Sequence, residues 1–395
     1  MKKYYPYLIT VSHMINDSCQ SVLPALLPLF IYTYGLSLEQ AGFLILANTA
    51  LSSLLQPLLG YISDKLNQPR LIAAGTLLSA CSTGMMGFVS SYESLLVCAT
   101  LAGVGSSIFH PEGAKIMNRL GGGKKGKAMG TFAIGGSSGF AFGPLLAGAI
   151  AYTVGAHGLA AFTVAGIIIS TVLFLLMPRI VAHAQTIDQA VATENPTVAA
   201  QPLKNYWKYF GILFIIILSQ SVNFRVINAF IPVFWTHELG TSPEQGSFAL
   251  TVFFSIGIFM TYIGGLLGDK YGPIKIIRLS LLIWLPSMFL LTQVPEFSVT
   301  IMMPLAYLIL LMIGAAKAIS YSPVIVLGQT YLAKSIGFAS GITLGVSQTI
   351  GGIIAPVVGN LADTYSLAAA MMTLVPFLIV GLGASLLLKD PKKLQ

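Results

Sequence analysis

Twelve apolar runs divide the chain, and each is long enough to cross the hydrocarbon core of a bilayer, which takes about 20 residues. Hydrophobic residues make up 55% of the sequence and charged residues only 9%, too few to cover a soluble globule of 395 residues. The runs predict an all-α integral membrane protein with twelve transmembrane helices, the first of them a retained span because it is too long for the core of a signal peptide. They lie near residues 7–33, 39–61, 70–90, 94–117, 128–152, 157–177, 207–236, 244–268, 274–293, 297–330, 337–361 and 367–388.

One sequence pattern occurs twice, once in each half of the chain. Gly-x-x-x-Asp-Lys ends on Lys65 in the first half and on Lys270 in the second. Its aspartates, Asp64 and Asp269, are 269 − 64 = 205 residues apart, about half the chain. Each copy follows one apolar run and precedes another. The repeat predicts two related six-helix bundles joined head to tail.

A polar stretch near the middle of the chain separates the two halves. Residues 178–206 are rich in Ala, Gln and Thr and include three prolines, a composition typical of flexible connections. We expect residues 1–180 to form the N-terminal bundle, residues 181–205 a cytoplasmic linker, and residues 206–395 the C-terminal bundle.

Positive charges outside the spans fall on one side of the predicted membrane topology. Every Lys and Arg except Arg225 and Lys317 lies in a loop or terminus of that side, and acidic residues occupy the opposite loops. By the positive-inside rule both termini are expected in the cytoplasm. The net charge of +8 thus reflects topology, and we expect no nucleic-acid partner.

The sequence contains no pattern that is typical of an enzyme or a metal protein. Its three cysteines, Cys19, Cys81 and Cys98, lie inside apolar runs without metal-binding spacing and are interpreted as packing residues. A Walker A phosphate loop is absent, and the Gly-x-Ser-x-Gly match at residues 135–139 lies inside an apolar run without the strand that precedes a nucleophile elbow. We therefore expect no metal, no cofactor, no enzymatic activity and no ATP-driven pumping.

Six charged or imidazole side chains lie well inside the apolar runs, away from the residues at the ends of the runs, and each is costly unless it faces a cavity or a partner. In the first run His13, Asn16, Asp17 and Gln20 share one helical face. The rise of 1.5 Å per residue places Asp17 and His110 roughly 15 Å and 10 Å from the cytoplasmic ends of their helices, so that they can meet across one cavity wall. The six are His13, Asp17, His110, Glu112, Arg225 and Lys317.

The repeated Gly-x-x-x-Asp-Lys pattern, expected in the loops after the second and eighth spans, resembles the loop signature of the major facilitator superfamily. This resemblance implies two six-helix bundles around a central cavity, which rock to expose the cavity alternately on each side. It also implies that the loop residues act as gate latches. These residues are Gly60, Asp64, Lys65, Arg70, Gly265, Asp269 and Lys270.

Small residues in the fifth run have two interpretations, and both stay open. Gly139, Gly143, Pro144 and Gly148 resemble a motif associated with proton antiporters of that superfamily. Alternatively, they serve helix packing, since glycines spaced by four let helices approach closely and proline bends a span.

Three further patterns together resemble the fosmidomycin resistance protein group of the superfamily. They are Ser-His-x-x-Asn-Asp ending at Asp17, Gln-Pro-x-x-Gly-Tyr beginning at Gln56, and Phe-His-Pro-Glu ending at Glu112. The match covers most of the N-terminal half and patches of the C-terminal half. It implies a drug/proton antiporter of the plasma membrane, as in the inner membrane of bacteria.

Arg225 and Lys317, in the seventh and tenth runs, have no counterpart in that resemblance. Both lie roughly 25 Å from the cytoplasmic end of their helix. Two cations favour an anionic or zwitterionic substrate, but they can instead balance internal charge by pairing with Asp17 or Glu112. The candidate substrate-binding residues are Asn16, Gln20, Gln56, Phe109, Arg225, Asn228, Lys317 and Tyr321.

These observations lead to the hypothesis of proton-coupled transport. Asp17 and Glu112, together with His13 and His110, hold the coupling proton, because carboxylate and imidazole groups exchange protons near neutral pH. The predicted function is export of a small drug-like or anionic compound, such as the phosphonate fosmidomycin, in exchange for protons. The alternative is proton-linked import of a small organic anion. We expect a monomer, since twelve spans can enclose a cavity without a partner.

Overall fold

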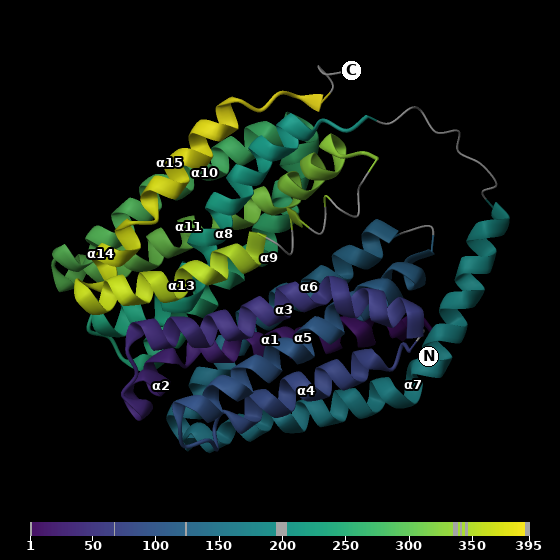
Figure 1. Ribbon diagram of the computed structural model, residues 1–395, viewed down its shortest axis with the longest axis horizontal. Coiled ribbons are helices and arrows are strands. Elements are labelled where there is room, and N and C mark those ends of the chain that lie inside the picture. The colour runs from purple at the N-terminus through teal and green to yellow at the C-terminus, as the bar shows by residue number, and fades with distance from the viewer. Residues whose placement is uncertain are drawn as a thin grey trace. The chain divides into compact units, whose positions relative to one another are not determined.

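The computed structural model describes residues 2–66, 68–122, 125–194, 204–334, 339, 342–343 and 347–391. These residues are almost entirely helical (Figure 1). The extended pairing found among them is one isolated bridge between Asn205 and Leu332. Helices are the expected outcome, because backbone groups in lipid must find their hydrogen-bond partners within their own segment.

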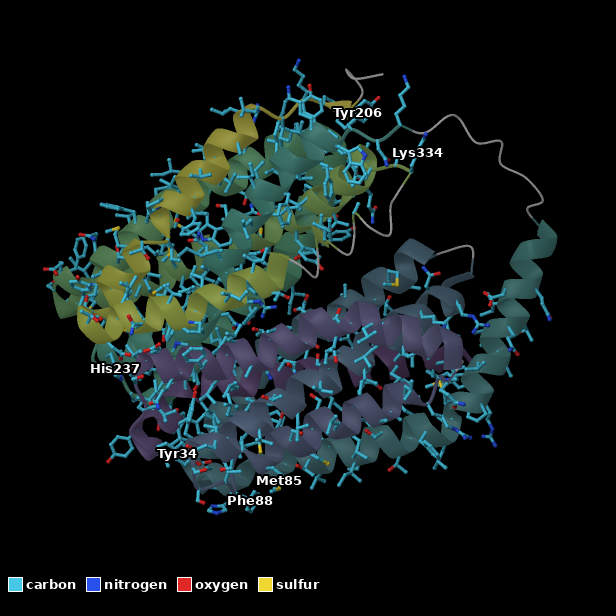
Figure 2. The ribbon with its side chains drawn as sticks, in the orientation of Figure 1. Tyr34, Met85, Phe88, Tyr206, His237 and Lys334 are labelled. Atoms are coloured by element: carbon cyan, nitrogen blue, oxygen red, sulfur yellow. The ribbon has the colours of Figure 1, made fainter. Side chains whose placement is uncertain are left out.

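Seven α-helices come from the first half of the chain. The shortest, α2, ends at Tyr34, which is labelled in Figure 2 together with Met85 at the end of α4. Two short 3-10 helices, at Lys2–Tyr4 and Ala156–Leu159, precede α1 and α7. The α-helices are α1 Tyr5–Ala25, α2 Leu27–Tyr34, α3 Leu38–Leu66, α4 Leu71–Met85, α5 Tyr92–Gly121, α6 Lys125–Val154 and α7 Ala160–Glu194.

The second half supplies the remaining helices. The first of them, α8, ends at His237, which Figure 2 labels. The last predicted span is divided into α14 and α15, with Pro376 in the first turn of α15. The elements are α8 Trp207–His237, α9 Pro243–Tyr271, α10 Pro273–Gln293, a 3-10 turn at Val294–Glu296, α11 Val299–Tyr331, α13 Ser347–Thr364, α14 Leu367–Met372 and α15 Val375–Leu386.

Eight helices of the described part are long and apolar enough to cross a membrane. A ninth span results if α1 and α2, which meet at 48°, are counted as one broken span. Pro24 and Pro28 flank this break, where their missing amide hydrogens interrupt the helical ladder. The chain is thus a multi-span helical membrane protein, and the number of twelve spans stays a prediction.

The chain forms two compact units. Unit 1 consists of residues 1–23 and 47–201, and unit 2 of residues 24–46 and 202–395. Unit 1 has a hydrophobic core that includes Ile9, Ile72, Phe109 and Leu173, and in it α4 lies beside both α5 and α7 (Figure 1). Residues 24–46 therefore pack with the second half of the chain. They comprise the break after α1, all of α2 and the start of α3. The predicted division of the sequence into two halves did not anticipate this.

Within unit 2, the start of α3 is fixed to the end of α13. The Asp363 carboxylate accepts hydrogen bonds from the backbone amides of Leu38 and Glu39, at 2.8 and 2.9 Å. The side-chain amide of Asn360 donates to the Glu39 carboxylate at 2.9 Å. A carboxylate at a helix N-terminus satisfies free amides and interacts favourably with the helix dipole. Asp363 thus holds the first turn of α3 in unit 2.

The repeated pattern lies at helix ends, where we expected loops. Asp269 and Lys270 belong to the last turn of α9, and both are exposed. Residues 60–65 continue α3, and the side chains of Asp64 and Lys65 lie outside the described part. Both helices continue past their predicted spans, α3 to Leu66 and α9 to Tyr271, and the gating role stays a prediction.

The predicted linker is in part helical. The last helix of the first half, α7, continues to Glu194, well past residue 181 where we expected a flexible segment to begin. Ala, Gln and Glu favour helix, and Arg119 Nε donates to Asp188 Oδ2 at 2.8 Å, which ties this extension to α5. The rest of the predicted linker up to residue 203 lies outside the described residues.

In unit 1, α6 approaches α1 closely at two of the glycines of the fifth run. A Cβ atom on Gly143 would lie 2.7 Å from the Ser18 carbonyl oxygen and would overlap Ser21 Oγ. A Cβ on Gly139 would lie 2.9 Å from Asp17 Cβ. Gly139, Gly143, Pro144 and Gly148 thus lie in a helix whose small residues bring it against the polar face of α1.

Replacing Gly143 with Val is expected to destabilise unit 1 by at least about 1–3 kcal/mol, the usual cost of overpacking, because the added atoms meet Ser18 and Ser21. The midpoint of thermal unfolding in detergent measures this loss. Gly130→Val is the matched control, since Gly130 lies in the same helix with open space around it. Equal midpoints for the two variants would contradict the close approach.

Candidate functional site

Asp17 lies between two histidines inside unit 1. Its Oδ2 atom is 3.2 Å from His13 Nε2, one turn earlier on α1. Its Oδ1 atom is 3.3 Å from His110 Nε2 on α5. The side chain of Asp17 is 5% exposed, whereas that of His110 is 26% exposed. The shared face and the similar depth predicted for these residues therefore bring all three together, and His110 is the member with access to solvent.

The other ring nitrogen of each histidine contacts a backbone carbonyl. His13 Nδ1 lies 2.8 Å from the Phe132 carbonyl oxygen, and His110 Nδ1 lies 2.9 Å from that of Ser106. A carbonyl oxygen can only accept, so each Nδ1 carries a hydrogen and donates it. Each Nε2 is thereby directed at the carboxylate of Asp17.

Helix α6 covers the cluster with residues that sequence reasoning missed. The Phe132 ring stacks on the His13 ring with centroids 3.9 Å apart. A Cβ on Gly136 would lie 2.7 Å from His13 Nε2 and 2.8 Å from Asp17 Oδ2. Because glycine has no side chain, position 136 leaves room for His13 and Asp17. Nothing in the sequence, however, indicates which residue of α1 Gly136 or Phe132 contacts.

Two predicted substrate-binding amides on α1 have protein partners. Asn16 Nδ2 donates to Asp17 Oδ1 at 3.1 Å and to Ser106 Oγ at 3.3 Å. Gln20 Nε2 donates to Ser79 Oγ on α4 and to the Ala102 carbonyl oxygen on α5. Asn16 thus orients the carboxylate, and Gln20 ties three helices together.

Glu112 lies two residues after His110 but contacts a different charge. Its Oε1 atom is 3.8 Å from Lys115 Nζ on the same helix, and its carboxylate is buried. Asp17 has imidazole neighbours and Glu112 an ammonium neighbour, so the two acids that we grouped in one proton site differ in environment.

The three residues around Asp17 also have a spacing that suits a metal ion. One ligand atom each from His13, Asp17 and His110 lies within 4.8 Å of the other two, a group found in the described part of the chain. The sequence predicted no metal, and this stays a prediction. Direct hydrogen bonding between imidazole and carboxylate accounts for the same arrangement.

Two cations in unit 2 lie against one aromatic ring. Lys317 Nζ on α11 is 4.5 Å from the centroid of the Phe224 ring on α8, and 4.9 Å from that of Tyr321. The guanidinium carbon of Arg225 is 5.8 Å from the Phe224 centroid. Aromatic faces attract cations, so Phe224 holds both side chains near each other despite their like charge. Nothing in the spacing of the sequence indicated that Phe224 lies beside both cations.

These cations belong to none of the ion pairs in the described residues. Both side chains are partly accessible, and Arg225 Nε is buried without a hydrogen-bond partner among the described atoms. On the same helix, Asn228 Oδ1 is buried without one as well. The unpartnered donor on Arg225 and the two positive charges suit an anionic group, whereas Asn228 Oδ1 is an acceptor and suits a donor group.

The remaining predicted substrate residues lie in different settings. Phe109 is fully buried in the core of unit 1, where its ring is 5.6 Å from that of His13. Gln56 on α3 is half-buried, and Tyr321 is 39% exposed beside Lys317. Of the three, Tyr321 therefore has the accessible side chain and the charged neighbour that substrate binding requires.

A multi-span helical protein with buried charges on its polar helix faces is by class a membrane transport protein. The family profile of the Major Facilitator Superfamily matches residues 9–356 and 213–395. The chain belongs to the Major Facilitator Superfamily, and it is a transporter and not an enzyme.

Two bacterial relatives match almost the whole chain. One is an uncharacterized MFS-type transporter, YfnC, of Bacillus subtilis (strain 168), 30% identical over 98% of this chain and 94% of the relative. Another is the fosmidomycin resistance protein of Escherichia coli (strain K12), 30% identical over 91% of this chain and 86% of the relative. The resemblance drawn from the sequence motifs is thereby confirmed.

Solved structures share the fold. A bacterial homologue of the human lysosomal transporter Spinster, in an inward-facing and occupied conformation, has a TM-score of 0.76 at 17% identity and covers 98% of this chain and 96% of its own. A D-xylose-proton symporter has a TM-score of 0.75 at 15% identity, with the same coverage. At these identities the likeness concerns the fold alone.

Proposed function

We propose that this transporter exports a small anionic compound, of the type of the phosphonate fosmidomycin, in exchange for protons. One observation carries the proposal: Asp17, buried within a membrane helix, has a histidine Nε2 beside each of its carboxylate oxygens. Such a cluster gains and loses protons at a point where an isolated charge would be costly. The fosmidomycin resistance relative supports the direction and the substrate class.

Protons enter and leave the cluster through His110. Its ring is more accessible than the carboxylate that it contacts, so water reaches it first. His110 and His13 hold protons on their Nε2 atoms, and the Asp17 carboxylate between them stabilises the charged rings. Glu112, paired with Lys115 nearby on α5, supplies a second acidic group on the same helix.

The substrate anion binds in unit 2. Arg225 offers a planar guanidinium with a free Nε, and Lys317 offers an ammonium beside Phe224 and Tyr321. Arg recognises carboxylate or phosphonate oxygens in pairs, and Lys adds a point charge. Asn228, on the same helix as Arg225, can accept a hydrogen bond from a donor group of the substrate through its unpartnered Oδ1 atom.

The proposed topology has twelve spans with both termini in the cytoplasm. Residues 1–180 and 206–395 form six-helix bundles that alternate the access of the cavity, as proteins with internal repeats of this kind do. The protein works as a monomer in the plasma membrane. The excess of Lys and Arg on one side supports this orientation.

Proton-linked import of an organic anion is the second candidate, and the charges involved favour it. Protons that move together with an anion compensate its negative charge, which lowers the electrostatic cost of carrying the anion across the membrane. In an exporter, by contrast, the protein must bind the substrate during one half of the transport cycle and the proton during the other half.

The sign of an imposed pH gradient distinguishes the two candidates. Inverted membrane vesicles that contain the protein are given an acid or an alkaline interior, with fosmidomycin as the probe. Because the interior corresponds to the outside of the cell, an acid interior is expected to drive fosmidomycin inward. Vesicles without the protein are the control.

Each alternative result has a definite meaning. If an acid interior drives preloaded fosmidomycin out, the transporter is a symporter and the export proposal is wrong. If neither gradient moves fosmidomycin while unlabelled fosmidomycin exchanges with labelled, transport is independent of protons and the role of the cluster is refuted.

A further inference from the structure

We infer that the cluster of His13, Asp17 and His110 binds two protons, one in each contact between a histidine Nε2 and an Asp17 oxygen. The inference deepens the proposed function, because it gives the number of protons exchanged per cycle at the same site. The count itself rests on geometry within unit 1 and does not depend on the direction of transport.

The positions of the Nδ1 hydrogens fix the starting point. Both Nδ1 atoms face backbone carbonyl oxygens, of Phe132 and Ser106, which accept and never donate. His110 Nδ1 also lies 3.2 Å from Ser106 Oγ, and because the nearer carbonyl requires a hydrogen on Nδ1, this hydroxyl acts there as a second acceptor. A neutral imidazole has one ring hydrogen, and in each histidine that hydrogen is engaged on Nδ1. In the neutral rings, therefore, both Nε2 atoms present lone pairs to the carboxylate.

Each Nε2 faces a different oxygen of the carboxylate. His13 Nε2 is 3.2 Å from Oδ2, and His110 Nε2 is 3.3 Å from Oδ1. With no added proton, both contacts bring lone pairs together and are repulsive. One added proton makes one contact attractive, and the carboxyl group can supply a hydrogen to only one side. Two added protons make both contacts attractive, so this geometry corresponds to two.

The side chains that surround the cluster do not take up these two protons in its place. On α1, Asn16 Nδ2 donates to Asp17 Oδ1 and supports its charged form, and Cys19 is the neighbouring titratable side chain. On α5, the charges of Glu112 and Lys115 pair with each other. On α6, the residues that face the cluster are Phe132, Gly136 and Gly139, none of which titrates.

The number of protons exchanged per substrate sets the largest substrate gradient that the transporter can maintain. If two protons are exchanged for one substrate without a membrane potential, a pH difference of one unit supports a substrate gradient of about 100-fold. If one proton is exchanged, the limit is about 10-fold. Loss of both protons removes both attractive contacts, which separates His110 on α5 from Asp17 on α1 and links deprotonation to helix movement.

The test uses nuclear magnetic resonance of the full chain in detergent, with nitrogen-15 in its five histidines, titrated between about pH 5 and pH 9. His13→Gln and His110→Gln each remove one signal and assign it. We expect both rings to reach the form with hydrogen on both nitrogens while Asp17 stays a carboxylate. The two titrations should be coupled, and both should change in Asp17→Asn.

Asp188→Asn is the matched control, because it removes a carboxylate of α7 that pairs with Arg119 away from the cluster. It is expected to leave both titrations unchanged. If Asp17→Asn does not fold, the response of His110 to His13→Gln reports the same coupling. The inference is overturned if only one of the two rings takes up a second hydrogen, or if either ring titrates without regard to Asp17.

The result is separable from that of the transport assay. Two coupled, doubly protonated rings without pH-driven movement of fosmidomycin would refute the proposed function and keep the proton count. Gradient-driven transport with a single protonated ring would keep the function, and the limiting substrate gradient would then be about 10-fold per pH unit.

Discussion

Asp17→Asn is expected to lower pH-gradient-driven transport of fosmidomycin by about 100-fold or more, in line with the loss of a positioned proton-transfer group. Asn has nearly the shape of Asp, so it can occupy the same position between His13 and His110, but it has no negative charge to hold the protons on the two rings. Exchange of labelled for unlabelled fosmidomycin, which needs no net proton movement, should persist. The ratio of driven transport to exchange in vesicles is therefore the quantity to measure.

The matched control removes a carboxylate of the same kind elsewhere in unit 1. Asp188→Asn on α7 breaks a contact with Arg119 and leaves the cluster untouched, so its ratio should equal that of the unmodified protein. Loss of both activities in Asp17→Asn would indicate damage to the fold instead of to coupling. Undiminished gradient-driven transport in that variant would refute the role of Asp17.

Lys317→Gln and Arg225→Gln are each expected to weaken fosmidomycin binding by about 10- to 100-fold, since hydrogen bonds to charged groups contribute about 1.5–3 kcal/mol. Both cations lie beside Phe224 and outside the ion pairs of the described residues, so their charge is available to an anion. Equilibrium binding of labelled fosmidomycin to purified protein measures the dissociation constant. Lys275→Gln, which removes an exposed charge at the start of α10, is the control.

Thermal stability separates the two interpretations of these cations. A partly buried cation without an acidic partner costs desolvation energy, so its removal should leave the unfolding midpoint unchanged or raise it. If the cations instead balance the charge of Asp17 or Glu112, their removal would leave an acid unpaired and lower the midpoint. Weaker binding at undiminished stability supports the substrate site, and unchanged binding at lower stability supports internal charge balance.

The sequence predicted the features that depend on local periodicity. Apolar runs of membrane-spanning length indicated helices, and the spacing of His13, Asn16 and Asp17 placed them on one helix face. Their motifs also indicated the family, which the comparisons confirm. The expected meeting of Asp17 with His110 followed from helix direction and rise per residue, which are properties of single helices.

Boundaries were less predictable, because apolar residues and good helix formers extend helices past the spans that hydropathy marks. The Asp269-Lys270 pair lies in the last turn of α9 and not in a loop, and α7 continues to Glu194 through residues expected to be flexible. The hydrogen bonds from the start of α3 to Asp363 join residues more than 300 positions apart. The hydropathy of a segment depends only on neighbouring residues along the chain, so it cannot predict such long-range contacts.

By itself the sequence determined the helical membrane class, the family and the polar face of α1, since each follows from residue types at short spacing. Only the tertiary structure decided which atoms meet. It directed the two histidine Nδ1 atoms to the carbonyls of Phe132 and Ser106, and it placed Phe224 beneath two cations. The physical reason is that the rotation and depth of one helix against another depend on the packing of all their neighbours, whereas the pattern along a helix depends on its own residues alone.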